Sequence, residues 1–233
     1  MPLPAGFMLK AYSVPAVLVG PRGDAVVPAH PSRRLAATFF VSLDGVVESP
    51  EKWSFPFWND EIQKFKLDET FATDTLLLGR VTYEGFAAAW PERKDPDGFA
   101  DRFNSIPKYV VSSTLKKLEW NNSHLIRGDV AREVAKLKQQ PGQDIVIHGS
   151  PGLIRSLLPH DLIDEYRLLV YPLVLGKGKR LFDESSAANL KLAESAAFDT
   201  GVVKLIYRPA DKAPDTARIS TSLPRQARRP GQK

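Results

Sequence analysis

Short apolar runs alternate with amphipathic stretches along most of the chain, from Leu35 to Tyr207. Runs rich in β-branched and aromatic residues predict strands over residues 35–43, 75–78, 108–111, 124–126, 145–147 and 166–175. Apolar positions three and four apart predict helices from Asn59 or Asp60 to about Thr73, over 130–139 and over 153–158. A short helix that contains 82–84 and is ended by Pro91 is also predicted. Two final runs, 190–198 and 202–207, predict an antiparallel hairpin turned at 199–201. This alternation is typical of an α/β fold with a mixed, mainly parallel sheet and helices on both faces.

A strand, a turn and a helix follow one another between Asp144 and Leu158. The β-branched run 145–147 is followed by a turn that contains Gly149, Ser150 and Gly152. A strand that enters a helix through such a turn directs free backbone N–H groups, and the positive end of the helix dipole, at the turn. This geometry favours phosphate binding, although glycine at such a turn also serves tight packing alone.

Four aromatic residues lie close together in a stretch with two prolines: Trp53, Phe55, Phe57 and Trp58. They either cap the core or line a pocket for a flat ligand. In the helix that follows, the positions expected to face the core are Ile62, Phe65, Phe71 and Ala72.

The formal net charge of +5 is unevenly distributed. Residues 1–34 carry +3 and residues 208–233 carry +5, whereas the body between them carries −3. The body therefore lacks the basic surface of a nucleic-acid-binding protein. Residues 1–33 contain six prolines and predict an N-terminal extension, and the polar residues 209–233 predict a disordered basic tail. The predicted domain spans 34–208.

The chain contains no cysteine. This excludes disulfides, cysteine-ligated zinc and thiol nucleophiles, and it fits a reducing compartment. We predict a cytoplasmic protein without a metal site. No run approaches the roughly 20 apolar residues of a membrane-spanning helix, so no membrane partner is expected.

Five local patterns occur in a characteristic order: SLDG at 42–45, LGRVTYEG at 78–85, YVVSSTL at 109–115, IVIHGSPGLIRSLL at 145–158 and VYPLVLGKGKRLF at 170–182. In this order they resemble the dihydrofolate reductase-like superfamily. The resemblance is greatest to the branch that includes the reductase domain of the riboflavin-pathway deaminase–reductase, and it covers about residues 34–208. The zinc motif of the associated deaminase domain is absent.

The resemblance implies a three-layer, NADPH-binding α/β fold that reduces a flat nitrogen heterocycle. The pyrophosphate and 2′-phosphate of NADPH require helix N-termini, hydroxyls and an arginine. The positions that match the family's cofactor-binding segments are Gly79, Arg80, Thr82, Ser112, Ser113, Thr114, Gly149, Ser150, Gly152 and Leu153. Each also has an ordinary interpretation: a surface ion pair for the arginine, a helix cap for the Ser-Ser-Thr run and simple turns for the glycines.

Two positions at the glycine turn need separate interpretation. Ser150 stands where the family often has a second glycine, and its hydroxyl adds a phosphate ligand at the cost of added bulk. His148, directly before the turn, is interpreted as a buried strand-end residue and not as an acid catalyst.

Hydride transfer to a C=N bond also needs a proton source beside the acceptor. Two carboxylates are candidates: Asp44 in the SLDG turn, and Glu61, which precedes Phe65 by one helical turn as in the acid–aromatic pair of dihydrofolate reductases. The alternatives are a turn residue for Asp44 and a helix-dipole charge for Glu61. Trp58 is a candidate pocket wall. Two lysines either attract a phosphorylated substrate or face solvent: Lys177 and Lys179.

The sequence thus predicts an NADPH-dependent reductase of a pterin, a folate or a ribosylaminopyrimidine, and a homodimer by family analogy. The alternative from another class is a non-catalytic NADP(H)-binding sensor, or an interaction protein that uses its basic tail. A flavin-dependent enzyme is a third hypothesis.

Overall fold

The computed structural model describes residues 18–19, 25–26, 32–184 and 186–210. The chain divides into two units, residues 1–31 and 32–233. In the first unit, β1 (Leu18–Val19) and β2 (Ala25–Val26) pair in antiparallel fashion. The predicted extension over 1–33 and the predicted tail over 209–233 therefore lie mostly outside the described residues.

The second unit is built on an eight-stranded sheet of order β6-β5-β4-β7-β3-β8-β10-β9. All neighbours from β6 to β8 are parallel, whereas β10 is antiparallel to both β8 and β9. This confirms the mixed, mainly parallel sheet and its C-terminal hairpin. The strands are β3 (Leu35–Ser42), β4 (Thr73–Gly79), β5 (Lys108–Val111), β6 (Ser123–Ile126), β7 (Asp144–His148), β8 (Glu165–Tyr171), β9 (Leu190–Ala197) and β10 (Val203–Pro209).

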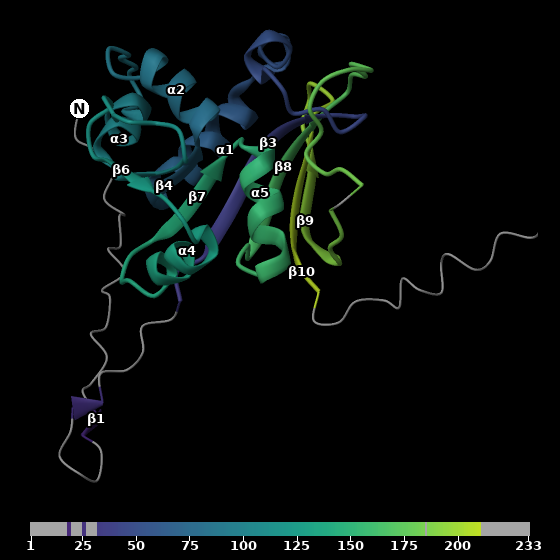
Figure 1. The fold of residues 1–233 in the computed structure, drawn as a ribbon. Helices are drawn as coiled ribbons and strands as arrows, with labels where there is room; N and C mark the ends of the chain where they lie inside the picture. Colours follow the sequence, from purple (N-terminus) through teal and green to yellow (C-terminus); the bar gives the residue numbers. More distant parts are fainter. Residues whose placement is uncertain (1–17, 20–24, 27–31, 185, 211–233) are drawn as a thin grey trace, which may run out of the picture. The chain divides into compact units, whose positions relative to one another are not determined.

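Helices cover both faces of the sheet, so alternate residues of one strand pack into different cores. In β4, Leu77 packs with residues of α4 and α5, whereas Leu76 and Leu78 pack with residues of α2 and α3. A third cluster joins α1 to β8. Figure 1 shows α4 and α5 together on one face. The helices are α1 (Asp60–Phe71), α2 (Arg80–Ala89), α3 (Phe99–Ser105), α4 (Val130–Lys138) and α5 (Pro151–Leu157), with 3-10 turns η1 (Pro50–Lys52), η2 (Phe55–Phe57) and η3 (Leu158–His160).

The burial of α1 differs from the prediction. Ile62 is fully buried and Phe65 is partly buried, as expected, but Phe71 is 49 % exposed and Ala72 is also exposed. The helix instead buries polar side chains of its C-terminal half, Lys66, Glu69 and Thr70. The expectation for Phe71 and Ala72 was wrong because the sheet beneath α1 offers charged partners, which a hydropathy pattern does not show.

The end of β8 and the presence of α3 also differ from prediction. β8 ends at Tyr171, well before Leu175, because Pro172 lacks the N–H that would continue the ladder. Helix α3 follows the charged loop 92–98 and was not predicted. Its seven residues are too few to display a clear period.

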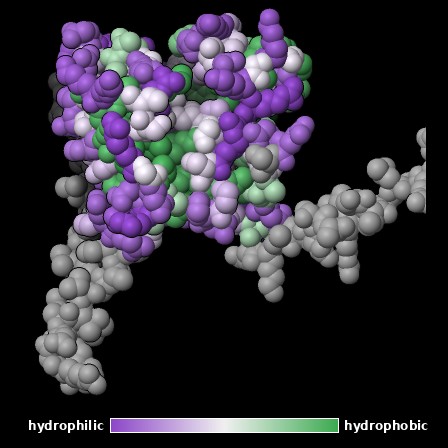
Figure 2. Space-filling view, in the orientation of Figure 1, coloured by the Kyte–Doolittle hydropathy of each residue, from purple (hydrophilic) through white to green (hydrophobic). Residues whose placement is uncertain are grey.

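The carboxyl ends of the parallel strands lie at one edge of the sheet, at the top of Figure 1. In the same orientation, Figure 2 is hollowed at the top, and hydrophobic side chains gather near the centre of the face while hydrophilic ones cover its periphery. In the described part of the chain, no helix has the length and apolar character that crossing a bilayer requires.

Candidate functional site

The chain leaves two neighbouring parallel strands, β4 and β7, in opposite directions. After β4 it continues to β5, whereas after β7 it passes β3 and reaches β8. Such a reversal leaves a crevice outside the carboxyl ends of the strands, where open α/β sheets bind ligands. Leu77 pairs with Ile147 in the ladder, so Gly79 and Gly149, just beyond these residues, come side by side.

Four of the predicted cofactor-binding residues meet in this crevice. The Ser150 hydroxyl accepts a hydrogen bond from the Gly79 N–H at 2.9 Å and lies 2.8 Å from the Thr82 hydroxyl. A Cβ on Gly79 would lie 2.8 Å from the Ser150 Oγ, and a Cβ on Gly149 would lie 3.2 Å from the Thr82 Oγ1. Gly149 also has φ +58°, a conformation that favours glycine. The close approach of two loops therefore requires glycine at both positions.

The helix that begins at this crevice is α2, with Gly79 as its N-cap and Arg80 as its first residue. Its first N–H groups have no acceptor within the helix and, with the helix dipole, favour an anion. Arg80 forms an ion pair with Glu84 at 2.9 Å, and both side chains are 46 % exposed. The surface ion pair considered for Arg80 is therefore present, but such pairs contribute little and leave the guanidinium available to phosphate.

The two predicted residues on α5 differ in their availability. The N–H of Leu153 already donates to the Ser150 carbonyl at 2.9 Å, and the Leu153 side chain is buried. Gly152 is exposed at the start of the helix.

A second part of the predicted cofactor site lies at the ends of β5 and β6, two strands from β7. Ser112 is mostly buried, and its hydroxyl accepts hydrogen bonds from the N–H groups of Thr114 and Leu115 at 3.2 and 3.0 Å. These hydrogen bonds close a local turn and are not the helix cap considered as the alternative, because no helix begins between Ser112 and Ser123. Beside it lies a cavity of about 350 Å³, lined by Val111, Ser112, Ser113, Ile126, Arg127, Gly128 and Val130.

Asp44 holds the turn after β3 to the loop after β8. Its carboxylate accepts hydrogen bonds from the Ser42 hydroxyl at 2.7 Å and from the N–H groups of Leu175 and Gly176 at 3.1 and 2.9 Å. These donors, the Ser42 hydroxyl first, lower the pKa of Asp44 to about 2. Asp44 is therefore an ionised acceptor at neutral pH.

Glu61 and Phe65 point to different parts of the molecule. The Glu61 carboxylate is exposed and accepts from the Asn59 amide at 2.9 Å and from the Asp199 N–H at 2.8 Å, so it ties α1 to the hairpin turn. The Phe65 ring lies 5.5 Å from the Lys204 ammonium and lines a cavity near the amino ends of the strands. The structure does not bring this pair to the crevice.

The remaining substrate-site candidates lie at the carboxyl edge. Trp58 is 39 % exposed, and its ring packs 6.3 Å from that of Phe40. Lys177 and Lys179 are both exposed, and Lys179 lies 3.6 Å from Glu48. The four aromatic residues divide between the two predicted roles, since Phe55 and Trp58 are exposed whereas Trp53 and Phe57 pack against the Tyr171 ring.

Comparison with protein families gives a match over residues 33–204 to the RibD C-terminal domain. The chain belongs to the RibD C-terminal domain family. The uncharacterized protein YyaP of Bacillus subtilis (strain 168) is 33 % identical over 186 residues, which are 75 % of this chain and 94 % of YyaP.

Solved structures show the same fold at lower identity. A protein from Shewanella sp. PV-4 assigned to riboflavin biosynthesis superposes with a TM-score of 0.61 at 21 % identity, covering 76 % of this chain and 99 % of that one. Dihydrofolate reductase from Enterococcus faecalis, in complex with NADP(H) and RAB-propyl, has a TM-score of 0.52 at 19 % identity, covering 76 % and 97 %. This RibD C-terminal domain therefore has the predicted dihydrofolate reductase-like fold.

One functional candidate had no sequence signal. Arg127 follows β6, as Ser112 follows β5, and the parallel register of Val111 with Ile126 brings the two positions to the same cavity. No motif includes Arg127, and only the pairing of β5 with β6 places an arginine beside the serines.

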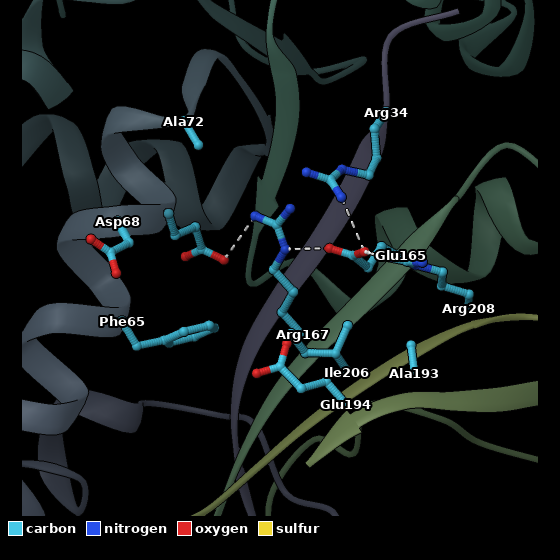
Figure 3. Close-up of a pocket in the computed structure, with 11 residues that line it drawn as sticks. Arg34, Phe65, Asp68, Ala72, Glu165, Arg167, Ala193, Glu194, Ile206 and Arg208 are labelled. Atoms are coloured by element: carbon cyan, nitrogen blue, oxygen red, sulfur yellow. Dashed lines mark hydrogen bonds and ion pairs between the residues drawn. The ribbon is translucent and has the colours of Figure 1, made fainter. Parts of the chain in front are cut away.

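The RibD C-terminal domain also contains an ionic cluster under α1, near the amino ends of its strands. Arg167 lies between three carboxylates, with hydrogen bonds to Glu165 at 2.7 Å, Asp144 at 2.7 Å and Glu69 at 3.4 Å. Lys66 pairs with Glu69. Figure 3 shows Arg167 and Arg34 both directed at Glu165, in a cavity of about 290 Å³. Since these charges neutralise one another, the cluster stabilises the contact of α1 with the sheet.

Burial, with a smaller contribution from this cluster, makes His148 neutral. Its ring packs 5.4 Å from that of Phe103. Burial and the positive charges of Lys66 and Arg167 lower the pKa of His148 to about 3, against the attraction of Glu69. This fits the interpretation of His148 as a strand-end residue. For Glu69, burial works to raise the pKa, but the charges of Lys66 and Arg167 outweigh it and lower the pKa to about 2.

We expect the free energy of unfolding to fall as the pH drops below 6.5, the ordinary pKa of a histidine such as His148. The unfolded chain then binds a proton at His148 that the folded chain does not bind, which costs at most about 1.4 kcal/mol per pH unit. Glu69 adds a second loss of unfolding free energy below pH 4.5, the ordinary pKa of a glutamate. Urea unfolding between pH 7 and pH 3, at about one-unit steps, measures both.

His148→Gln removes the loss between pH 6.5 and 4.5 and keeps the loss at lower pH. His124→Gln is the control, because His124 is exposed and stacks on Tyr109 at the far edge of the sheet. If the free energy of unfolding of His148→Gln falls with pH as steeply as that of the unchanged protein, His148 is not the residue responsible.

Proposed function

We propose that this RibD C-terminal domain protein is an NADPH-dependent reductase that transfers hydride to a flat nitrogen heterocycle of the pterin, folate or ribosylaminopyrimidine type. The observation that carries the proposal is the meeting of Gly79, Thr82, Gly149 and Ser150 at the crevice between β4 and β7. The two glycines let the loops after β4 and β7 approach closely enough that the Thr82 and Ser150 hydroxyls lie 2.8 Å apart, which gathers two hydroxyl ligands for a phosphate at the start of α2. Family membership supports the same reaction class.

The residues suited to the cofactor fall in two groups. The start of α2, with Arg80 and Thr82, and the turn at Gly149 and Ser150 would hold the pyrophosphate. Ser112, Ser113 and Arg127 would hold the 2′-phosphate, because hydroxyls and a guanidinium are its preferred ligands. When bound, NADPH supplies the hydride.

At the substrate end, the ionised Asp44 orders the loop that carries Lys177 and Lys179. We assign Asp44 to the positioning of this loop and not to proton donation, because its carboxylate is ionised at neutral pH, and Trp58 to a pocket wall. The exposed lysines favour a substrate that carries a phosphate. A cytoplasmic homodimer is part of the same proposal by family analogy.

A titration of the purified protein with NADPH and with NADH, followed by tryptophan quenching, tests the proposal first. We expect tight binding of NADPH and binding of NADH at least about tenfold weaker, because only NADPH carries the 2′-phosphate. Arg127→Ala lowers the affinity for NADPH and leaves that for NADH unchanged. Binding of neither nucleotide would overturn the reductase proposal.

Asp44→Asn is expected to lower turnover by at least about tenfold while NADPH affinity stays unchanged. The amide cannot accept all three hydrogen bonds as an ionised carboxylate does, so the loop after β8 loses its position. Steady-state kinetics and a nucleotide titration measure the two effects. Glu133→Gln on α4, an exposed carboxylate paired with Lys136, is the control.

One observation favours the non-catalytic alternative. Both candidate carboxylates, Asp44 and Glu61, already accept hydrogen bonds from the chain itself. A sensor or interaction protein would bind NADPH without turnover in a screen of pterins and pyrimidines, and its partner binding would fail on deletion of residues 211–233. A reductase keeps full turnover after that deletion.

A further inference from the structure

Tyr171, the last residue of β8, has a buried hydroxyl that makes no hydrogen bond of normal geometry with the described residues, and the nearest group of note is the Ser54 hydroxyl. The residue is 0 % exposed. Burial raises the pKa of Tyr171, and the neighbouring Ser54 hydroxyl works in the opposite direction. An unsatisfied buried hydroxyl costs stability and is rare in native proteins, so it calls for a functional explanation.

The position of Tyr171 suits the substrate end of the proposed reductase. Tyr171 pairs with Ser42 at the carboxyl end of β3, and β3 is the direct neighbour of β7. His148, the last residue of β7, is level with Thr38, whereas Tyr171 is level with Ser42. At about 4.8 Å between strands and about 3.3 Å per residue, the backbone of Tyr171 is therefore about 16 Å from the end of β7. The tyrosine and the glycine turn therefore share the carboxyl edge of the sheet.

Aromatic rings enclose Tyr171 in a way that a flat heterocycle can reproduce. The rings of Phe40, Trp53 and Phe57 lie 5.4, 5.3 and 5.7 Å from the Tyr171 ring, the last two edge-on. We call residues 53–58, which supply two of these rings, the aromatic segment. A planar heterocycle has the shape and π surface to replace one of its rings against Tyr171.

The aromatic segment is weakly attached to the sheet. Its backbone N–H groups at Trp53, Ser54, Phe57 and Trp58 donate to carbonyls at positions 50, 54 and 55. The Trp53 and Trp58 indoles donate to Glu48 and Gln63, which are near in sequence. Among the described residues, the backbone and indole hydrogen bonds of this segment are local, and its contacts with the sheet are ring packing and the approach of the Ser54 hydroxyl to Tyr171. Such a segment opens at low free-energy cost.

We propose that the Tyr171 hydroxyl binds the substrate, donating a hydrogen bond to a ring carbonyl of the heterocycle that displaces part of the aromatic segment. This rests on the proposed function and narrows it to heterocycles that carry a carbonyl acceptor, as pteridinones and pyrimidinones do. Fully amino-substituted rings lack that acceptor and gain nothing from Tyr171.

The first test needs no ligand. Tyr171→Phe removes an unsatisfied hydroxyl, so its melting temperature is expected to rise by about 2–4 °C. Tyr83→Phe is the matched control: Tyr83 is equally buried, but its hydroxyl accepts from the Trp120 N–H at 3.0 Å, so its melting temperature should fall. A fall in Tyr171→Phe as well would show a satisfied hydroxyl and overturn the proposal.

The second test measures ligand choice with NADP⁺ present. Calorimetric titrations compare lumazine, which carries two ring carbonyls, with 2,4-diaminopteridine, in which amino groups replace them. Tyr171→Phe is expected to bind lumazine about tenfold more weakly and 2,4-diaminopteridine unchanged. An equal loss for both, or no loss for lumazine, would overturn the proposal. Failure of the protein to bind NADPH would overturn the proposed function. The melting comparison would still test whether the Tyr171 hydroxyl is unsatisfied, because it uses no ligand.

Discussion

Gly79→Ala is expected to lower the affinity for NADPH by about tenfold or more. The added Cβ would lie 2.8 Å from the Ser150 Oγ and 3.1 Å from its Cβ. Both atoms belong to a turn rather than to the end of a flexible chain, so the turn has to shift and the phosphate site with it. A nucleotide titration of the variant gives the affinity.

Two further variants make this result specific. The double variant Gly79→Ala with Ser150→Gly is expected to recover part of the affinity, because the second change removes the atoms that the new Cβ meets but also removes the Ser150 hydroxyl. Gly85→Ala is the matched control in α2, since nothing lies within 4 Å of its added Cβ. It should keep the affinity and raise stability by about 0.5–1 kcal/mol. If Gly79→Ala and Gly85→Ala bind NADPH with equal affinity, the crevice beside Gly79 is not the cofactor site.

Arg167→Leu is expected to lower the free energy of unfolding by about 3–5 kcal/mol, because it leaves buried carboxylates without their counter-ion. Glu69 and Glu165 have side chains only 1 % and 3 % exposed, and both bond to Arg167. Urea unfolding at neutral pH gives the loss.

The control is an exposed ion pair on α1, the helix that the cluster contacts. Lys64 pairs there with Asp68, and the two side chains are 74 % and 65 % exposed. Lys64→Ala should cost less than about 1 kcal/mol. If Arg167→Leu costs no more than Lys64→Ala, the cluster does not hold α1 to the sheet. Any folded Arg167→Leu protein should still bind NADPH, since Arg167 bonds to Glu69, Asp144 and Glu165, none of which belongs to the glycine turn.

Regular elements could be predicted where the chain's own pattern specifies them. β5 was predicted with its observed limits, and the hairpin β9–β10 within two residues, because β-branched runs and glycine turns are local signals. The start of α1 was predicted at Asn59 or Asp60, and Asn59 is the cap, since its side chain accepts from the Ile62 N–H at 3.0 Å. Local chemistry determines these features before any tertiary contact forms.

The inner face of α1 could not be predicted in this way. A hydropathy pattern ranks Phe71 above Glu69, yet Glu69 is buried and Phe71 is exposed. The preference is reversed by two cations that pair with Glu69: Lys66, three residues earlier on α1, and Arg167, which is 98 positions away in the chain. Burial of a charge depends on a partner, and the partner's position depends on strand order.

The sequence by itself determined the family, the mainly parallel sheet and the set of glycine and hydroxyl residues that we assign to NADPH. Tertiary structure alone decided which of them meet. Gly79, Thr82, Gly149 and Ser150 come together because β4 and β7 are neighbours, while Phe65 faces a different cavity and Arg127 joins Ser112. Residue type and spacing fix what a side chain can bind, but proximity across a sheet depends on which strands pair, and that choice minimises the free energy of the whole domain.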